Sequence, residues 1–206
     1  LWNMNTERRW VIFDLGKVLL DFDFAIAAKE LARYSPQEEE QILKSINQSP
    51  LLHTFERGDW SEAQFFQKLS VECRLEASLE ELKKGFAEIF TPVPSMIGFM
   101  ESLKERGIPV MVFSNTNVTA VDYIRAAFPF FERFDAYCLS YEHGCMKPDT
   151  TLYGVAQSMI RCRPENLLFL DDRAENVNAA RQIGWNAIHH QAPEETIQSV
   201  NQWLLA

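Results

Sequence analysis

The sequence has little of what marks several specialised classes of protein. It contains only 8 glycines and 9 prolines in 206 residues, without a repeat or a low-complexity tract, which excludes collagen-like and low-complexity disordered chains. No apolar run approaches the ~18 residues that a transmembrane helix requires, so we expect no membrane partner. With 47% hydrophobic and 24% charged residues, the composition is that of a globular protein with one large domain or a core plus a small insert.

The cysteines lack the spacing of a zinc site or a disulfide framework. Cys73, Cys138, Cys145 and Cys162 form no Cys-x-x-Cys pair, and no paired histidines stand at zinc-ligand intervals. Because a chain of this size needs no disulfide to stabilise it, we expect four reduced thiols. The first four residues lack the charged region and apolar stretch of a secretory signal, so we expect a cytoplasmic protein.

Basic residues are also scarce. The 20 Lys and Arg residues stand against 29 Asp and Glu, which gives a net charge of −9, and much of the acidic excess lies in residues 21–91. Nucleic-acid binding needs a basic stripe that this balance does not favour. We therefore expect no nucleic-acid partner, and the sequence gives no indication of the oligomeric state.

Three short apolar runs indicate buried strands, at residues 10–13, 109–113 and 167–170. Continuous apolar runs of this length are typical of parallel sheets that helices cover on both faces. Helical patterns at 95–106, 149–160 and 175–183 alternate with these runs. The pattern predicts an α/β fold with a Rossmann-like, doubly wound parallel sheet.

Residues 21–91 differ from the rest of the chain. They contain no strong strand run, and Glu, Gln, Leu and Phe recur at helical spacing, with turns expected at 35–36, 49–50 and 57–59. We interpret this segment as a small all-helical domain inserted after the first strand. The expected division is a core of residues 1–20 and 92–206 and a helical cap of residues 21–91.

Polar residues stand where the predicted strands end. Asp14, Ser114 and the pair Asp171 and Asp172 follow the three apolar runs, and parallel strands bring their carboxyl ends to one edge of the sheet. Asp14 alone could be a helix or turn cap, and Ser114 could begin an ordinary turn. Two adjacent carboxylates repel each other at a buried strand end unless a cation compensates them, which favours a metal site.

The order of these residues adds a family resemblance. Four segments resemble the motifs of the haloacid dehalogenase (HAD) superfamily of Mg²⁺-dependent phosphohydrolases: Phe13-Asp14-Leu15-Gly16-Lys17-Val18, Val112-Phe113-Ser114-Asn115, Met146-Lys147-Pro148 and Leu170-Asp171-Asp172. Their spacing suits a member with a helical cap after the first strand. The Phe-Asp-Leu-Gly opening, Ser-Asn-Thr-Asn and Glu56-Arg57-Gly58 most resemble the sugar-phosphate phosphatases of the α-D-glucose-1-phosphate phosphatase type.

The resemblance implies a role for each motif residue. Asp14 would be the nucleophile that forms an aspartyl-phosphate, assisted by Ser114 and Lys147. The phosphate would be bound by Leu15, Gly16, Ser114, Asn115 and Lys147. A Mg²⁺ ion would be held by Asp14, the Gly16 carbonyl and Asp172, with Asp171 as a second or water-mediated ligand. Asn176 would either orient the carboxylates without binding the metal itself or be an ordinary residue in the first turn of the next helix.

One position departs from the motif. Most members of the superfamily have a second aspartate two residues after the nucleophile, as general acid and base, whereas this sequence has Gly16. Asp21, Asp23 or a substrate hydroxyl are the candidate substitutes. In the cap, Asp21, Asp23, His53, Glu56 and Arg57 are candidates to contact sugar hydroxyls.

Three functions remain from the sequence. The first is a Mg²⁺-dependent phosphatase acting on a small phosphorylated metabolite, such as a sugar phosphate. The second is a 2-haloacid dehalogenase that uses Asp14 without a metal, against which the Asp171 and Asp172 pair speaks. The third is a module that binds a phosphorylated ligand without turnover, which Gly16 alone suggests.

Overall fold

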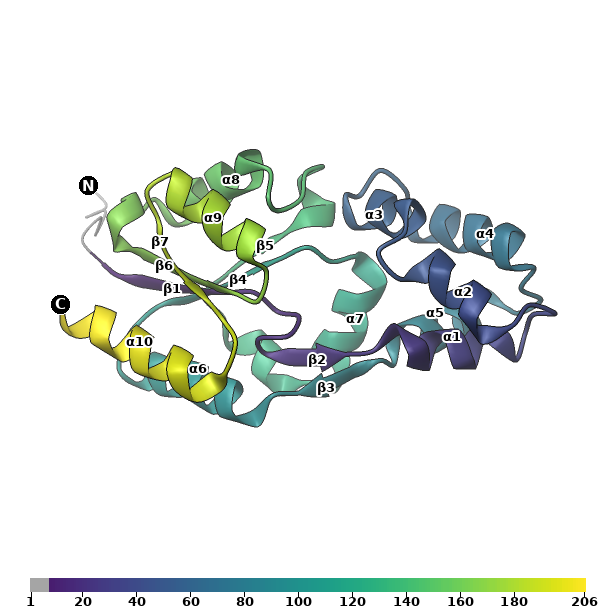
Figure 1. The fold of residues 1–206 in the computed structure, drawn as a ribbon, viewed down its shortest axis with the longest axis horizontal. Coiled ribbons are helices and arrows are strands. Elements are labelled where there is room, and N and C mark those ends of the chain that lie inside the picture. The colour runs from purple at the N-terminus through teal and green to yellow at the C-terminus, as the bar shows by residue number, and fades with distance from the viewer. Residues whose placement is uncertain (1–7) are drawn as a thin grey trace.

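The central sheet has five parallel strands in the order β5-β4-β1-β6-β7 (Figure 1). The computed structural model describes residues 8–206; the residues on which the expectation about a secretory signal rests lie outside the described residues. The strands are β1 (Trp10–Phe13), β4 (Val110–Ser114), β5 (Ala136–Leu139), β6 (Leu167–Asp171) and β7 (Asn186–His189). The predicted doubly wound parallel sheet is confirmed, and its three central strands are the three apolar runs of the sequence.

Helices cover both faces of this sheet. One face carries α6 (Pro94–Glu105), α7 (Val118–Ala127) and α10 (Pro193–Leu205), and the other carries α8 (Thr150–Ile160) and α9 (Ala174–Gln182) (Figure 1). Short 3₁₀ helices η1 (Pro129–Arg133), η2 (Ser140–Glu142) and η3 (Pro164–Asn166) lie in the connections. Successive side chains of a strand point to opposite faces, so Ile12 and Phe13 belong to different apolar clusters, one on each side of the sheet.

The three central strands are aligned in register. Ile12 of β1 lies opposite Met111 of β4 on one side and opposite Phe169 of β6 on the other. Because all three run in parallel, the residues that follow Phe13, Phe113 and Leu170 reach the same edge of the sheet. The parallel pairing of the strands is therefore sufficient to bring Asp14, Ser114 and Asp171 to one edge of the sheet.

A second, antiparallel ribbon connects this core to a bundle of helices. The ribbon pairs β2 (Leu20–Phe22) with β3 (Phe90–Pro92). Between these strands lie α1 (Phe24–Ala32), α2 (Glu39–Ile46), α3 (Pro50–Glu56), α4 (Glu62–Cys73) and α5 (Leu79–Ala87). Serine residues cap α3, α4 and α5 at their N-termini, and Pro50 occupies the first turn of α3.

The helices α1–α5 have an apolar cluster of their own, separate from the two clusters on the sheet. At its centre the rings of Phe55 and Phe65 stack with centroids 4.2 Å apart, and Phe65 meets Phe86 edge to face. The bundle lies beyond the carboxyl ends of the strands (Figure 1). It is therefore placed to cover the edge of the sheet where Asp14, Ser114 and Asp171 end.

The turn after α3 is fixed against the core. Ser140 Oγ donates to the backbone oxygen of Glu56 at 2.6 Å and accepts from the Thr116 amide at 3.0 Å. Gly58 has φ +82°, and a Cβ at this position would lie 2.1 Å from the Tyr141 carbonyl oxygen. Glycine is therefore required here for its conformation and for the close approach of two backbones.

Two further expectations concern the whole chain. Each of the four cysteines is a free thiol, as the sequence predicts. Among the described residues, no helix combines the length and the apolar character that crossing a membrane would require.

Candidate active site

The ends of the three central strands bring Asp14, Ser114 and Asp171 to one edge of the sheet. Asp14 directly follows β1, and its amide donates to the Leu170 carbonyl oxygen of β6 at 2.8 Å. Ser114 and Asp171 are the last residues of β4 and β6, and all three side chains are buried. The sheet thus holds three of the predicted residues by its backbone hydrogen bonds.

Lys147 is the cation at the centre of this group. Its Nζ lies 2.8 Å from Asp14 Oδ1 and 2.7 Å from Asp171 Oδ2, and it donates to the Phe113 carbonyl oxygen at 2.9 Å. The residue is only 5% exposed, so water hardly weakens these ion pairs. The ammonium group therefore fixes the carboxylates of two different strand ends relative to each other.

Asn115 holds the segment that carries this lysine. Its side-chain oxygen accepts from the Lys147 amide at 2.8 Å, and its Nδ2 donates to the Lys147 carbonyl oxygen at 2.9 Å. The side chain of Asn115 is consequently a positioning group. The sequence assigns this residue a phosphate-binding role through its backbone amide, which its side-chain contacts leave untouched.

The two adjacent aspartates lie in different environments. Asp171 is fully buried and accepts hydrogen bonds from Asn176 Nδ2 to both carboxylate oxygens, at 3.1 and 3.0 Å, and from the Arg173 amide at 2.8 Å. Asp172 is half-buried. Asn176, for which the sequence left two readings, is thus in direct contact with the carboxylate cluster.

Burial and like charge act on the ionisation of these groups. Burial raises the pKa of Asp14 above its usual range, the Lys147 ammonium opposes that change, and the Asp171 carboxylate adds to it. Burial alone would lower the pKa of Lys147, but the carboxylates of Asp14 and Asp171 outweigh it and raise the pKa. Burial, followed by Asp171, also raises the pKa of Asp172. The site holds excess negative charge that a cation would relieve.

The carboxylates are close enough to share one cation. Asp14, Asp171 and Asp172 each offer an oxygen atom, and these three oxygens lie within 4.8 Å of one another. Hard oxygen donors in such a group suit Mg²⁺, which takes carboxylate, carbonyl and water ligands. The residues present therefore fit the metal that the sequence resemblance implies.

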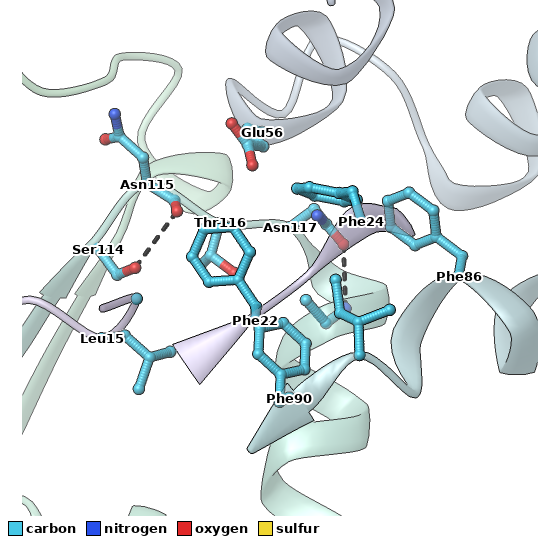
Figure 2. Close-up of a pocket in the computed structure, with 13 residues that line it drawn as sticks. Leu15, Phe22, Phe24, Glu56, Phe86, Phe90, Ser114, Asn115, Thr116 and Asn117 are labelled. Atoms are coloured by element: carbon cyan, nitrogen blue, oxygen red, sulfur yellow. Dashed lines mark hydrogen bonds between the residues drawn. The ribbon is translucent and has the colours of Figure 1, made fainter. Parts of the chain in front are cut away.

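A pocket opens beside Asp14, between the edge of the sheet and the helices α1–α5. Leu15, Gly16, Ser114 and Asn115 contribute to its lining, so the structure brings these predicted residues together. Figure 2 shows Ser114 and Asn115 on one side of the pocket, with Phe22, Phe24, Phe86 and Phe90 on the other. Asp14, Lys147, Asp171 and Asp172 are not among the described residues that line it.

The loop after β1 is shaped by close contacts. The Leu15 amide donates to Asp14 Oδ1 at 2.8 Å, so in this arrangement it orients the carboxylate rather than facing the pocket. A Cβ at Gly16 would lie 2.7 Å from Cε1 of Phe22. The aromatic ring therefore occupies the space that the missing aspartate side chain would need.

Of the five cap residues named from the sequence, the pocket includes Glu56 alone. Its side chain hangs from the end of α3 toward the pocket (Figure 2). Burial raises the pKa of Glu56 to about 7; the Arg173 guanidinium opposes this change, and Asp14 adds to it.

The other cap candidates are engaged elsewhere or exposed. Asp21 pairs with Lys17, and Asp23 accepts from the Ala25 amide as the N-cap of α1. Arg57 pairs with Asp59 at 2.6 Å, and His53 is exposed. Neither aspartate proposed as a substitute for the missing acid lines the pocket.

The sequence did not identify the aromatic side of the pocket. Phe22 and Phe90 come from the two strands of the ribbon, Phe24 begins α1, and Phe86 lies on α5. Phenylalanine is ordinarily a core residue, so its presence in a helical segment carries no functional signal. Recognising the pair Phe22 and Phe90 required the pairing of β2 with β3, which links residues far apart in the chain.

A family model described as a haloacid dehalogenase-like hydrolase matches residues 9–184. A D-ribitol-5-phosphate phosphatase of Bacteroides thetaiotaomicron is 23% identical over 85% of this chain and 88% of its own. A sesquiterpene phosphatase of Aspergillus oryzae is 27% identical over 90% of this chain and 91% of its own.

A solved structure has the same fold. The crystal structure of a HAD family enzyme from Bacteroides thetaiotaomicron, in complex with magnesium and inorganic phosphate, has a TM-score of 0.79 and 20% identity. The match covers 90% of this chain and 95% of that one.

Proposed function

Since the chain belongs to the haloacid dehalogenase-like hydrolase family, we propose that it is a Mg²⁺-dependent phosphatase of small phosphate monoesters. The observation that carries the proposal is the buried contact of Lys147 with Asp14, 2.8 Å apart, beside two further carboxylates. This arrangement offers one nucleophilic oxygen, one fixed cation and ligands for a divalent metal, which are the groups that phosphoryl transfer requires.

The two phosphatase relatives support this reaction class. Their names agree on the phosphate and differ in the alcohol, which is a sugar alcohol in one and a terpene alcohol in the other. The sugar phosphate expected from the sequence resemblance agrees with the first relative and not with the second. The proposal is therefore made for phosphate monoesters as a class.

Asp14 is the proposed nucleophile. Its Oδ1 accepts from the Leu15 amide and faces Lys147 Nζ, each at 2.8 Å, so the carboxylate is held in one orientation. A carboxylate oxygen of Asp14 forms a bond to phosphorus while the bond from phosphorus to the alcohol oxygen breaks. Water then attacks the phosphorus of this aspartyl-phosphate and releases phosphate, which restores Asp14.

Ser114 and Lys147 are the proposed side-chain donors to the phosphoryl group. Ser114 lines the pocket, and Lys147 supplies a positive charge next to Asp14. The backbone amides of Gly16 and Asn115 lie at the same edge and are the proposed backbone donors. The Leu15 amide could donate to the phosphoryl group only if its hydrogen bond to Asp14 Oδ1 were broken. We therefore expect it to contribute least to phosphate binding.

Asp172, Asp14 and the Gly16 carbonyl are the proposed ligands of Mg²⁺. The bound ion would neutralise the carboxylates and allow an anionic ester to approach an anionic nucleophile. Asp171 already accepts from Lys147, Asn176 and the Arg173 amide. We therefore assign Asp171 mainly to holding Lys147, and Asp172 to the metal.

Glu56 is the proposed general acid and base in place of the missing aspartate. Its carboxyl group faces the pocket from the cap, and with a pKa of about 7 it is partly protonated at neutral pH. The protonated group would donate to the departing alcohol oxygen. The resulting carboxylate would then accept a proton from the attacking water, so that one residue serves both steps.

Residues 21–91 are the proposed cap domain. Their helices carry Phe24, Glu56 and Phe86 to the pocket, and the contacts of Ser140 and Gly58 seat the turn after α3 on the core. In this position the cap shields the reacting groups from water. We assign substrate selection to this domain and the chemistry to residues 1–20 and 92–206.

The two alternative functions receive less support. A metal-independent dehalogenase has no use for three converging carboxylates. A module without turnover was suggested by Gly16 alone, and Gly16 has another explanation in its close packing against Phe22.

The direct test measures phosphate release from p-nitrophenyl phosphate by the full chain, with and without Mg²⁺. We expect release that requires Mg²⁺ and that Asp14→Asn abolishes. Release of halide from 2-chloropropionate without metal would instead establish the dehalogenase. Phosphate binding without release from any monoester tested would establish the module without turnover.

A further inference from the structure

The pocket beside Asp14 has two chemically different sides. Backbone and side-chain polar groups of residues 114–117 face it from the core. The opposite side consists of aromatic side chains from the ribbon and the cap, Phe22, Phe24, Phe86 and Phe90 (Figure 2), and the aliphatic Ile89 also lines the pocket. A bound monoester with its phosphate near Asp14 and Ser114 must place its alcohol part against this apolar side.

The four rings form one contiguous cluster, in which Phe86 is buried. Phe22 meets Phe24 edge to face with centroids 5.7 Å apart, Phe22 lies 6.2 Å from Phe90, and Phe24 lies 6.1 Å from Phe86. Phe22, Phe24 and Phe90 are only half-buried. Their rings therefore still have apolar area that a ligand could remove from water.

Phe22 also packs against the loop that follows Asp14. Its ring packs so closely on Gly16 that a Cβ there would lie 2.7 Å away. Gly16 is two residues from Asp14, and its backbone is among the groups proposed to bind phosphate and metal. The apolar surface thus begins next to the phosphate rather than at the far end of the pocket.

Two of the five polar side chains that line the pocket, Asn115 and Asn117, are already engaged with the protein. The amide group of Asn115 is paired with the Lys147 backbone, and Asn117 Oδ1 accepts from the Ala120 amide at 3.0 Å as the N-cap of α7. Glu56 is the one ionisable side chain among the 13 residues that line the pocket in the described chain. A polyol placed against Phe22, Phe24 and Phe90 would bury hydroxyl groups against side chains that offer no hydrogen-bond partner, which is unfavourable.

We propose that the substrate is a phosphate monoester of an apolar alcohol, with alkyl, alkenyl or aryl carbon next to the phosphate, rather than a phosphorylated sugar or polyol. This inference rests on the proposed phosphatase function and assigns the specificity to Phe22, Phe24, Phe86 and Phe90. The pocket holds about 70 Å³ of free volume, so a long chain requires the rings or the cap to move. The test accordingly uses short esters.

The first experiment compares two primary phosphate esters of similar length on the unmodified full chain: isopentenyl phosphate and erythritol 4-phosphate. Phosphate release is measured as kcat/KM, with p-nitrophenyl phosphate as a third compound. We expect the apolar ester to be favoured about 10-fold or more, since a single carbon group in a hydrophobic pocket is worth about 10-fold in specificity. A polyol ester used equally well or better overturns the inference and leaves the phosphatase function intact.

The possible outcomes distinguish a failure of the phosphatase function from a failure of the proposed substrate class. Release from either ester or from p-nitrophenyl phosphate supports the phosphatase function, and the ratio between the two esters then decides the substrate class. Absence of release from all three compounds overturns the phosphatase function and this inference with it. Because this comparison needs no variant, it does not depend on whether a substituted chain folds.

The second experiment compares two variants of Phe24, one with leucine and one with asparagine. These two side chains resemble each other in size, but leucine is apolar and asparagine is polar. We expect Phe24→Asn to lower kcat/KM for isopentenyl phosphate about 10-fold through KM, and Phe24→Leu to stay within about 3-fold. The value for erythritol 4-phosphate should not fall in parallel. Val71→Asn, at a 78% exposed position on α4 of the same cap, is the control and should change neither value. Equal losses for both esters with Phe24→Asn would contradict the assignment of specificity to the rings.

Discussion

The two sides of the pocket are held together by different forces. On the core side, Lys147 contacts two carboxylates and a carbonyl oxygen within 2.9 Å, and Asn115 pairs with its backbone twice. On the cap side, rings contact rings with centroids about 6 Å apart, an interaction without strict direction. Directional hydrogen bonds fix the groups on the core side in place, whereas apolar contacts on the cap side constrain geometry less strictly.

This difference suggests why one fold can serve many substrates. A change in the core side breaks a buried network, in which removal of one partner leaves an uncompensated charge. A substitution on the cap side changes only the apolar area and the shape of the pocket. It should therefore cost less stability and mainly change which substrate is preferred. Substitutions on the two sides should therefore differ in both the size and the kind of their effect.

The largest effect is expected at Asp14. Asp14→Asn keeps the size of the side chain and removes the nucleophilic oxygen, so kcat should fall about 10⁴-fold or more with every monoester. Steady-state phosphate release measures this loss. Asp122→Asn, the same chemical change on the exposed surface of α7, should retain full activity. An Asp14→Asn enzyme that keeps more than about 1% of the activity would exclude Asp14 as the nucleophile.

The next largest effect concerns the two adjacent aspartates, which should behave differently. Removal of Mg²⁺ with a chelator should lower the activity about 10³-fold, because charge stabilisation by the ion is worth several kcal/mol. Thermal unfolding gives an independent measurement: Mg²⁺ should raise Tm in the unmodified chain and not in Asp172→Asn. The metal-free Asp172→Asn protein should be at least as stable as the unmodified one, since a carboxylate that repels Asp171 is gone.

Asp171→Asn provides the contrast. Because it weakens the buried ion pair with Lys147, it should cost about 3 kcal/mol of stability even without Mg²⁺. If Asp171→Asn and Asp172→Asn lose the Mg²⁺-induced rise in Tm equally while both remain stable, the division of roles between the two residues is wrong.

The core side was largely predictable from the sequence for a physical reason. Parallel strands bring their carboxyl ends to one edge, so Asp14, Ser114 and Asp171 could be placed together from three apolar runs alone. Lys147 lies in a loop, and its place at the centre came from the family resemblance. Its contacts with Asp14 and Asp171, 2.8 and 2.7 Å long, could not have been obtained from periodicity.

The cap side was not predictable in this way. Glu56 was named among five candidates to contact sugar hydroxyls, whereas the acid role was expected at Asp21, Asp23 or a substrate hydroxyl. What separates them is three-dimensional: Asp23 caps a helix and Asp21 pairs with Lys17, whereas Glu56 ends a helix whose next turn is seated on Ser140. The aromatic side of the pocket depends on the pairing of β2 with β3, which no local sequence pattern predicts.

An intermediate effect is expected at Glu56, the one acid among the described residues that line the pocket. Glu56→Gln should lower kcat about 10²-fold for alkyl esters, whose alcohol must leave with a proton. The loss for p-nitrophenyl phosphate should be below about 10-fold, because nitrophenolate leaves without one. Glu72→Gln on the exposed surface of α4 is the matched control. Equal losses for both kinds of ester would show that Glu56 does not transfer the proton.

The same residue predicts a pH dependence with a definite sign. The pKa of Glu56 is raised to about 7 by burial, and the first step requires its protonated form. The rate of alkyl ester cleavage should therefore fall as the pH rises through about 7. In Glu56→Gln this fall should disappear, because glutamine does not titrate. A profile that is unchanged by the substitution would assign the titration to another group.

The smallest effect is expected where the cap meets the core, and it sharpens the distinction between the two sides. Gly58→Ala places a Cβ 2.1 Å from the Tyr141 carbonyl oxygen at a φ of +82°, so the turn after α3 must withdraw. We expect a loss of about 1–2 kcal/mol in stability and a rise of about 10-fold in KM for monoesters. Inhibition by inorganic phosphate should be unchanged, because the proposed phosphate-binding groups lie on the core side.

Gly98→Ala on α6 is the matched control for this prediction. A Cβ there meets nothing within 4 Å and the residue is helical, so alanine should leave KM unchanged and stabilise the chain slightly. If Gly58→Ala weakens inhibition by phosphate as strongly as it raises KM, the position of the cap also determines the phosphate site. The two sides of the pocket would then form one unit, since displacing the turn that carries Glu56 would have disturbed groups held by the sheet.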